Sequence, residues 1–378
     1  MPYAAALSEH PLPTEAAGEV IGQVLEGVGP EPDLAIMFVT AAHGGALEDM
    51  ARAARTVLQP KALLAATAVS VVGGGREVEE QPAVTLWAGS FAGAPLTPVR
   101  IDAVRTSEGV VVGALPDAEP GSTLLLLVDP FTTPIDSMLE HWAEARPDLS
   151  IVGGLASAAR GPGGNRLVLD GTTYADGAVG VLLPPGVGAT SVVSQGCRPI
   201  GEPMIVTKSE RQVIYELAGQ PALARLLGLV DSLGPDERAL VQGGLHLGCV
   251  IDESKSTFER GDFLIRNVLG ADREVGAIAV GDEVPVGATV QFQVRDADSA
   301  DEDLRALLAG RHASGALVFT CNGRGTHLFG RPDHDAEVVS DHVDGGAVAG
   351  MFCAGELGPV GGRSFLHGFT ASVLLFER

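Results

Sequence analysis

Two glycine-rich segments near the C-terminus hold residues whose types and spacing could bind a small molecule. The first, residues 321–325 with the sequence CNGRG, directly follows the apolar run Ala316 to Thr320, a pattern typical of a buried strand. Ligands of α/β proteins commonly bind beyond the carboxyl ends of strands, where loops project. Glycines let the backbone approach a ligand closely, and Arg324 could form two parallel hydrogen bonds with a carboxylate or phosphate.

The second segment, residues 355–363 with the sequence GELGPVGGR, follows another apolar run, Val348 to Phe352. If the two strands are parallel neighbours, both segments open as loops at the same sheet edge. Glu356 could then pair with a ligand amine or with Arg324, and Pro359 would favour a preformed loop. Two such segments indicate a pocket more strongly than either does alone. The predicted ligand-binding residues are Cys321, Asn322, Gly323, Arg324, Gly325, Cys353, Gly355, Glu356, Gly361, Gly362, Arg363 and His367.

The same residues also admit a catalytic interpretation. Cys321 could act as a nucleophile, with His327 or His367 as its base and Glu356 orienting that base. Free cysteines at strand ends are, however, usually small buried hydrophobes. The sequence contains no GxSxG, HExxH or GxxxxGK[ST] pattern, and its nine histidines lack the spacing of metal ligands. We therefore predict no catalytic residue, no metal and no cofactor.

Three stretches of the chain place their expected elements in the same order. Each begins with a continuous apolar run, at Leu34 to Val39, Leu124 to Val128 or Ala316 to Thr320, as expected for strands buried on both faces. A helical pattern, a second strand, a glycine-rich loop and a third strand follow each run. We predict an α/β fold of repeated strand-helix-strand-loop-strand units in two packed domains with mixed sheets. In the second copy, Thr133 before Pro134 predicts a helix with Thr133 as its N-cap.

The region between the second and third copies has a different pattern. Residues 210–228 are interpreted as one or two helices interrupted by Pro221, and four strands are expected between His246 and Arg295. The composition changes near Gly196 to Pro203, which gives the domain boundary. We predict a helical lead-in at residues 1–32, an α/β domain at 33–199 and a second α/β domain at 200–378.

Charge and hydropathy exclude several classes of function. The chain carries 48 Asp and Glu residues against 25 Lys and Arg, which disfavours nucleic acid as a partner because like charges repel. No stretch approaches the roughly 18 uncharged residues of a membrane-spanning helix, and the N-terminus lacks the features of a secretion signal. The four cysteines lie far apart, as in a reducing compartment. We therefore expect a cytoplasmic protein without membrane insertion.

At its C-terminal motifs the chain resembles the FIST family, a two-part sensory module of signal-transduction proteins and of an F-box protein. The stronger similarity lies in GALVFTCNGRG at 315–325 and AGMFCAGELGPVGGRSFLHGFTASVLLF at 349–376. A looser N-terminal similarity rests on DLAIMFVT at 33–40, DPFTTPIDSMLE at 129–140, VGGLAS at 152–157 and GAVGVLL at 177–183. By this resemblance, residues 33–199 would be the FIST N-terminal-like domain and residues 200–378 the FIST C-terminal-like domain.

The resemblance implies binding of a small ligand such as an amino acid, with no established catalysis. Our own hypothesis adds that Arg324 receives the α-carboxylate and Glu356 the α-amine. The sequence contains no kinase, cyclase, chemoreceptor or F-box segment, so an unidentified signalling protein would be the partner. We therefore predict a ligand-sensing module. The alternatives are an enzyme that uses Cys321 with Glu356 or His367, and an interaction scaffold without a small ligand.

Overall fold

The computed structural model describes residues 2–106, 109–113 and 115–377, and it confirms the α/β class with mixed sheets. The chain forms two compact units. Unit 1 comprises Met1–Val193 and Leu304–Arg378, and unit 2 comprises Ser194–Asp303. Unit 2 is thus an insertion in the chain of unit 1. The predicted boundary at residues 199 and 200 lies near the start of this insertion, and the predicted extents of the domains stay a prediction.

The described part of unit 1 contains three six-stranded sheets. Sheet A has the spatial order β1 (Tyr3–Ser8), β6 (Val84–Gly89), β2 (Leu34–Thr40), β3 (Ala62–Ala68), β12 (Leu167–Leu169) and β13 (Thr172–Tyr174). Sheet B has the order β15 (Ala189–Gln195), β28 (Thr370–Phe376), β24 (Gly315–Cys321), β25 (Val348–Cys353), β4 (Ser70–Gly73) and β5 (Arg76–Glu79). Sheet C has the order β27 (Arg363–His367), β26 (Glu356–Val360), β11 (Ser150–Leu155), β10 (Thr123–Val128), β14 (Ala178–Leu183) and β7 (Thr97–Ile101).

The same strand pairing recurs in the three sheets. Each sheet contains a parallel pair of strands, and the first strand of that pair along the chain has an antiparallel neighbour on its other side. These strands are β2 with β3 and β6, β10 with β11 and β14, and β24 with β25 and β28. Parallel neighbours require a crossover connection, which contains α2 (Leu47–Leu58), α3 (Ile135–Ala145) and α8 (His334–Ser340), respectively. The predicted order of strand, helix, strand, loop and strand, and the reuse of one supersecondary unit, stay predictions.

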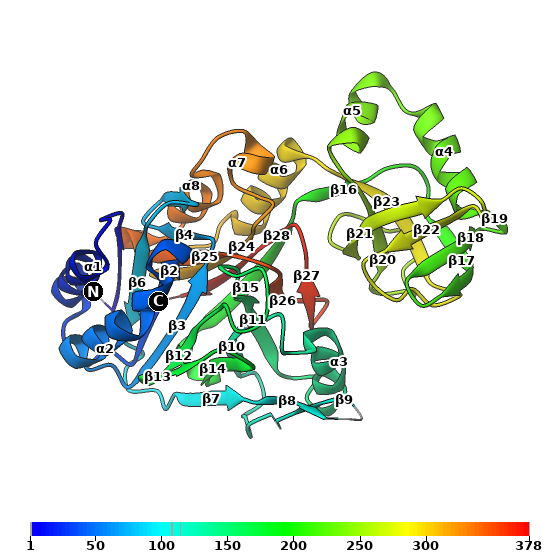
Figure 1. Cartoon of the computed structure of the whole chain (residues 1–378). Coiled ribbons are helices and arrows are strands. Elements are labelled where there is room, and N and C mark those ends of the chain that lie inside the picture. Colours follow the sequence, from blue (N-terminus) through cyan, green and yellow to red (C-terminus); the bar gives the residue numbers. More distant parts are fainter. Residues whose placement is uncertain (1, 107–108, 114, 378) are drawn as a thin grey trace. The chain divides into compact units, whose positions relative to one another are not determined.

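One apolar core joins the three sheets of unit 1. It contains Phe38 and Trp87 from sheet A, Phe319 and Phe376 from sheet B, and Leu125 from sheet C. The rings of Trp87 and Phe376 stack with their centroids 4.9 Å apart. Helices cover the other faces (Figure 1): α1 (Pro13–Val28) and α2 lie on sheet A, α8 on sheet B and α3 on sheet C. Strands between two apolar layers must be apolar on both sides, which explains the continuous apolar runs.

One local prediction in unit 1 differs from the structure. Helix α3 begins at Ile135 with Pro134 at the N-cap position and no side-chain cap, so the predicted Thr133 cap is wrong. The proline there has φ −79° and ψ 70°, which moves the helix start one residue beyond the expected cap. The run from Leu63 to Val72 forms two strands, β3 and β4, in different sheets.

Unit 2 is a closed antiparallel barrel. Its ring order is β23 (Thr289–Arg295), β17 (Met204–Glu210), β18 (Val213–Leu217), β22 (Ala277–Val280), β21 (Phe263–Asp272) and β20 (Leu245–Val250), and β20 pairs again with β23. The helices predicted at 210–228 are therefore partly wrong, because residues 213–217 form a strand. A short apolar run fits either element, and barrel pairing selects the strand. Smaller elements of this unit are β16 (Cys197–Pro199), β19 (Gln220–Pro221), α4 (Ala222–Ser232) and α5 (Pro235–Gly243).

The remaining elements are short or link larger ones. Helix α6 (Ala297–Leu308) connects the end of unit 2 to the return of the chain into unit 1, where Leu304 and Leu308 pack on sheet B. The others are η1 (Ala41–Ala46), β8 (Ala103–Thr106), β9 (Gly109–Val112), η2 (Pro185–Val187), α7 (Thr326–Phe329) and η3 (Asp344–Gly346).

Candidate functional site

The carboxyl ends of β24 and β25 bring the predicted site residues together. The two strands are parallel neighbours, and Cys321 pairs in register with Cys353. This confirms the expectation that both chain segments leave the same edge of one sheet. After β24 the chain turns at once, because the Arg324 N–H donates to the Cys321 carbonyl at 2.8 Å. This turn directs the Arg324 side chain into the protein.

The second glycine-rich segment is not a loop, so that prediction is wrong. Glu356–Val360 and Arg363–His367 form the strands β26 and β27, an antiparallel hairpin. The strand β26 joins sheet C by pairing with β11, with Glu356 opposite Gly154. Pro359, expected in a loop, lies in β26 opposite Ser364 of β27 and beyond the residues that pair with β11, so its missing N–H leaves the β11 pairing intact.

Arg324 is fully buried and forms a two-pronged ion pair with Asp335 of α8. Its Nε and Nη2 donate to the two carboxylate oxygens at 2.7 and 2.8 Å. Thr320 and His334 also bond this carboxylate, at 2.6 and 2.9 Å. Burial alone would raise the pKa of Asp335, but the Arg324 charge and these hydrogen bonds lower it. The paired edge of Arg324 is therefore occupied, and only Nη1 has no hydrogen-bond partner among the described residues.

Glu77 of β5 adjoins the Arg324–Asp335 pair by bonding the start of α8. Its Oε1 accepts the backbone N–H groups of Asp335 and Ala336 at 3.0 and 3.1 Å. Burial, followed by the negative charge of Asp335, raises the pKa of Glu77 to about 8. Its Oε2 is buried and accepts no hydrogen bond from the described chain. At neutral pH this carboxyl group is therefore mostly protonated.

Glu356 is fully buried at the start of β26. Its Oε2 accepts the Thr370 hydroxyl at 2.8 Å and the Thr370 N–H at 3.2 Å. Burial raises the pKa of Glu356 to about 8, although Thr370, Arg324 and the Cys321 thiol all act in the opposite direction. The Oε1 atom has no partner at hydrogen-bonding geometry in the described part of the chain. Glu77, Arg324, Asp335 and Glu356 are called the charged cluster below.

The two cysteines at the strand ends adjoin this cluster. Burial, then the nearby Glu356, raises the pKa of Cys321 to about 12. Cys353 is fully buried, and burial likewise holds its pKa well above the usual value. The predicted partner Glu356 does lie near Cys321, but the His367 Nε2 bonds the Gly358 carbonyl at 2.9 Å. Since the thiolate is the reactive form, this environment disfavours a nucleophilic Cys321.

The other predicted residues near the strand ends have structural contacts. Asn322 is exposed and its N–H donates to the Cys353 carbonyl at 3.0 Å, while the Gly323 N–H faces the Cys321 sulfur at 3.4 Å. Gly325 has φ +56°, and an added Cβ would lie 2.7 Å from a Glu79 oxygen. Gly355 is buried, and its carbonyl accepts the Leu155 N–H at 2.9 Å.

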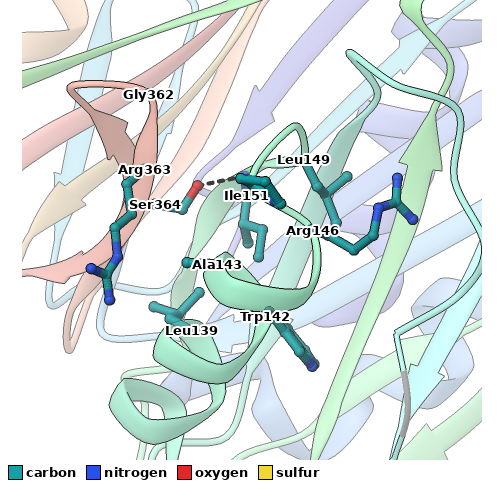
Figure 2. Close-up of a pocket in the computed structure, with 10 residues that line it drawn as sticks. Leu139, Trp142, Ala143, Arg146, Leu149, Ile151, Gly362, Arg363 and Ser364 are labelled. Carbon is teal, nitrogen blue, oxygen red and sulfur yellow. Dashed lines mark hydrogen bonds between the residues drawn. The ribbon is translucent and has the colours of Figure 1, made fainter.

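Three predicted residues lie elsewhere, at the tip of the β26–β27 hairpin. Gly361 and Gly362 form its two-residue turn with φ +61° and +81°, the conformation that hairpin turns of this length favour. Gly362 and Arg363 line a cavity of about 100 Å³ against α3, shown in Figure 2. This cavity is called the hairpin-tip pocket below. The single site predicted from the sequence is thus divided between the charged cluster and this pocket.

Comparison with known proteins assigns the family. Residues 33–220 match the FIST N domain, and residues 222–359 match the FIST C domain. The chain belongs to the FIST family. An uncharacterized protein of Mycobacterium bovis is 45% identical to this FIST chain over 371 residues, which cover 96% of the chain and 95% of that relative. An uncharacterized protein of Mycobacterium tuberculosis is 44% identical over 369 residues, covering 96% of both.

FIST domains are generally associated with signal transduction and sensing. The junction between the two FIST matches, at residues 220 and 222, falls within unit 2. Both parts of the divided site belong to unit 1. In residues 2–106, 109–113 and 115–377, no helix is long and apolar enough to cross a membrane, and no group of three or more His, Cys, Asp or Glu residues is arranged to hold a metal ion.

Sequence reasoning missed half of the charged cluster of this FIST protein. Asp335 lies in the polar helical segment after β24, and Glu77 follows the glycine turn between β4 and β5. A usable signal for Asp335 existed, because an arginine buried at a strand end requires a carboxylate partner. No comparable signal pointed to Glu77, which is 258 residues from Asp335 in the sequence.

Proposed function

We propose that this FIST protein senses a small zwitterionic ligand, an amino acid or a similar metabolite, at the charged cluster. The observation that carries the proposal is a pair of unsatisfied buried atoms. Arg324 Nη1 and Glu356 Oε1 have no hydrogen-bond partner among the described residues, although both side chains are fully buried. Buried polar atoms are normally paired, so a donor and an acceptor left open together favour a ligand that carries both an anion and a cation.

The two atoms match the ends of an α-amino acid. Nη1 would donate to a ligand carboxylate while Asp335 keeps the other edge of Arg324 fixed. Glu356 Oε1 would accept from a ligand ammonium while Thr370 holds Oε2. Preorganised groups bind more tightly because less ordering is required on binding. This revises the hypothesis from the sequence, since one nitrogen of Arg324 rather than its paired edge faces the ligand.

We propose that the ligand enters at the turn that follows β24. Cys321 is half-buried and Asn322 is exposed, so the cluster lies close to the surface beneath residues 321–325. Binding there would fix this turn, and a partner protein could detect the altered surface. We place the protein in the cytoplasm with an unidentified signalling protein as that partner, and we propose no catalytic step.

Thermal-shift screening against the twenty amino acids tests the proposal. A ligand at a hundred times its Kd stabilises the folded protein by roughly 2.7 kcal/mol. Glu356→Gln is the informative variant, because it removes the ionisable group without adding or deleting side-chain bulk, and Glu356 is itself mostly neutral at pH 7. It should abolish the ligand shift while the unliganded protein remains folded. The matched control is Glu337→Gln, which alters an exposed carboxylate of the same helix that carries Asp335.

The proposal also predicts a proton exchange. A ligand ammonium favours ionised Glu356, whose pKa is about 8 without ligand. Below pH 8, binding should therefore release a proton. The affinity for the ligand should increase by up to about tenfold for each unit by which the pH is raised toward 8. Calorimetry in buffers of different ionisation enthalpy measures that proton. The proposal is wrong if no amino acid shifts the unfolding temperature. It is also wrong if the Glu356→Gln variant binds the ligand as tightly as the wild type.

The enzyme alternative has its own measurement. With its pKa raised to about 12, Cys321 should react with iodoacetamide much more slowly at pH 7 than an ordinary exposed thiol. Mass spectrometry of labelled peptides reports each of the four cysteines separately. Rapid labelling of Cys321 would instead favour the nucleophile.

A further inference from the structure

The hairpin-tip pocket combines an apolar lining with a cation that has no acidic partner. Its floor is formed by Leu139 and Trp142 of α3 and by Ile151 of β11. These three side chains are at most 4% exposed and belong to the apolar cluster that packs α3 on sheet C. The pocket therefore exposes apolar core side chains to solvent. Water forms few hydrogen bonds there, so an apolar group can displace it favourably.

A hydrogen bond fixes one side of the pocket. The Ser364 hydroxyl oxygen accepts the Ile151 N–H at 2.8 Å, which fixes the hairpin to the start of β11. Figure 2 shows this bond, with Gly362, Arg363 and Ser364 on one side and α3 on the other. The turn at Gly361 and Gly362 reverses the chain within two residues and places Arg363 at the rim.

The two arginines that line the pocket differ in their partners. Arg146 is bound to Asp148 through Nε and Nη2, both at 3.2 Å, and to the Ala118 carbonyl at 2.8 Å. In Figure 2 its guanidinium points away from the hairpin. Arg363 lies 5.3 Å from the Phe365 ring, and no carboxylate within residues 2–106, 109–113 and 115–377 forms an ion pair with it. Arg363 therefore places a local positive charge at the rim of an apolar cavity, where it can attract an anion.

We propose that the hairpin-tip pocket binds a short branched-chain monocarboxylate, with its alkyl group on Trp142 and its carboxylate on Arg363. The size of the cavity selects the alkyl group. A dry apolar cavity of about 150 Å³ accepts benzene, so the roughly 100 Å³ here suits a branched chain of four or five carbons. The site is separate from the charged cluster and does not depend on the proposed amino-acid sensing.

Ligand-observed NMR and calorimetry with 4-methylpentanoate test this proposal on the full chain. The neutral isostere 4-methylpentanamide is the matched probe, because it keeps the alkyl group and removes the charge. We expect the acid to bind about tenfold more tightly than the amide, because a hydrogen bond to a charged group is stronger than one to a neutral group.

Two variants separate the two halves of the site. Arg363→Gln should remove the preference for the acid over the amide, and this exposed residue can be replaced without disturbing the core. Ala143→Leu should abolish binding of both probes, because Ala143 lines the cavity from α3 and the larger side chain would fill it. Arg52→Gln, at an exposed arginine of α2, should bind as the wild type does. Glu356→Gln should also leave this binding unchanged, which distinguishes it from the proposed amino-acid site.

Several results would overturn the proposal. One is the absence of binding by either probe up to about 20 mM, a level that detects even millimolar affinity. Equal binding of acid and amide to the wild type would remove the role of Arg363. Undiminished binding to folded Ala143→Leu protein would place the ligand elsewhere. Loss of acid binding in Arg52→Gln would show that a general charge effect, and not this pocket, attracts the acid.

Discussion

The charged cluster and the hairpin-tip pocket lie at opposite ends of one hairpin, yet they hold their arginines in opposite ways. Arg324 is fully buried, and Asp335 occupies two of its nitrogens. Arg363 is exposed, and its guanidinium lies 5.3 Å from the Phe365 ring. A buried cation must be neutralised within the fold, because its desolvation costs several kcal/mol. An exposed cation remains hydrated and available. Arg324 therefore has mainly a structural role and only its Nη1 atom is open to a ligand, whereas the whole guanidinium of Arg363 can bind an anion.

The largest difference between the regions should appear when the acidic partners are neutralised. Asp335→Asn leaves the Arg324 charge buried and uncompensated, which should lower the free energy of unfolding by about 3–5 kcal/mol. Asp148→Asn, beside the pocket, affects an exposed ion pair and should cause little change. Urea denaturation of both variants measures the contrast. Similar small losses for the two variants would show that Arg324 is not dependent on its partner.

Close packing beside the charged cluster should make Gly154 sensitive to an added methyl group. An added Cβ at Gly154 would lie 2.3 Å from the Cys353 sulfur, so Gly154→Ala should destabilise the protein by about 1–3 kcal/mol through overpacking. Removing the sulfur in the double variant Gly154→Ala, Cys353→Ala should recover part of that loss, because the two residues are in contact. A double-mutant cycle by urea denaturation measures the recovery. Additive losses would contradict the proposed clash.

The pH dependence of stability should differ between the regions. The pKa values of Glu77 and Glu356 are raised from 4.5 to about 8 in the folded protein. In this range the folded state holds protons that the unfolded state has lost, so these groups stabilise the fold at low pH. As the pH rises from roughly 4.5 to 8, this stabilisation is lost, and each group should lower the free energy of unfolding by up to about 1.4 kcal/mol per pH unit. Glu356→Gln should make this slope shallower, whereas Arg363→Gln should not alter it.

The smallest effect is expected at the hairpin turn. Gly362 has φ +81° and nothing within 4 Å of an added Cβ, so Gly362→Ala adds backbone strain without a clash. The loss should be about 1 kcal/mol, below that of Gly154→Ala. The thermal unfolding midpoints of the two variants give the order. A larger loss at Gly362 would mean that the turn, and not the cluster, limits the stability of the hairpin.

Much of the fold followed from apolar spacing, and the exceptions share one cause. The strands β2, β10 and β24 were predicted because burial on both faces requires continuous apolar residues. The hairpin at 356–367 was missed because Gly358, Pro359, Gly361 and Gly362 suggest a loop when considered locally. These residues form strands and a turn because β26 pairs with β27 and with β11. The strand β11 is distant in the sequence, so local patterns do not reveal that pairing.

The sequence alone determined the family, the α/β class, and the position of residues 321–325 at the end of a buried strand. Those features depend on local composition and on short-range periodicity, which a chain carries without folding. Only the tertiary structure decided which charges meet. Asp335 bonds Arg324 from α8, and Glu77 bonds the Asp335 N–H from the distant strand β5. Arg363, expected at the same site, lies at the far end of a hairpin. Charge pairing depends on which strands become neighbours, and the sequence around each residue does not specify that choice.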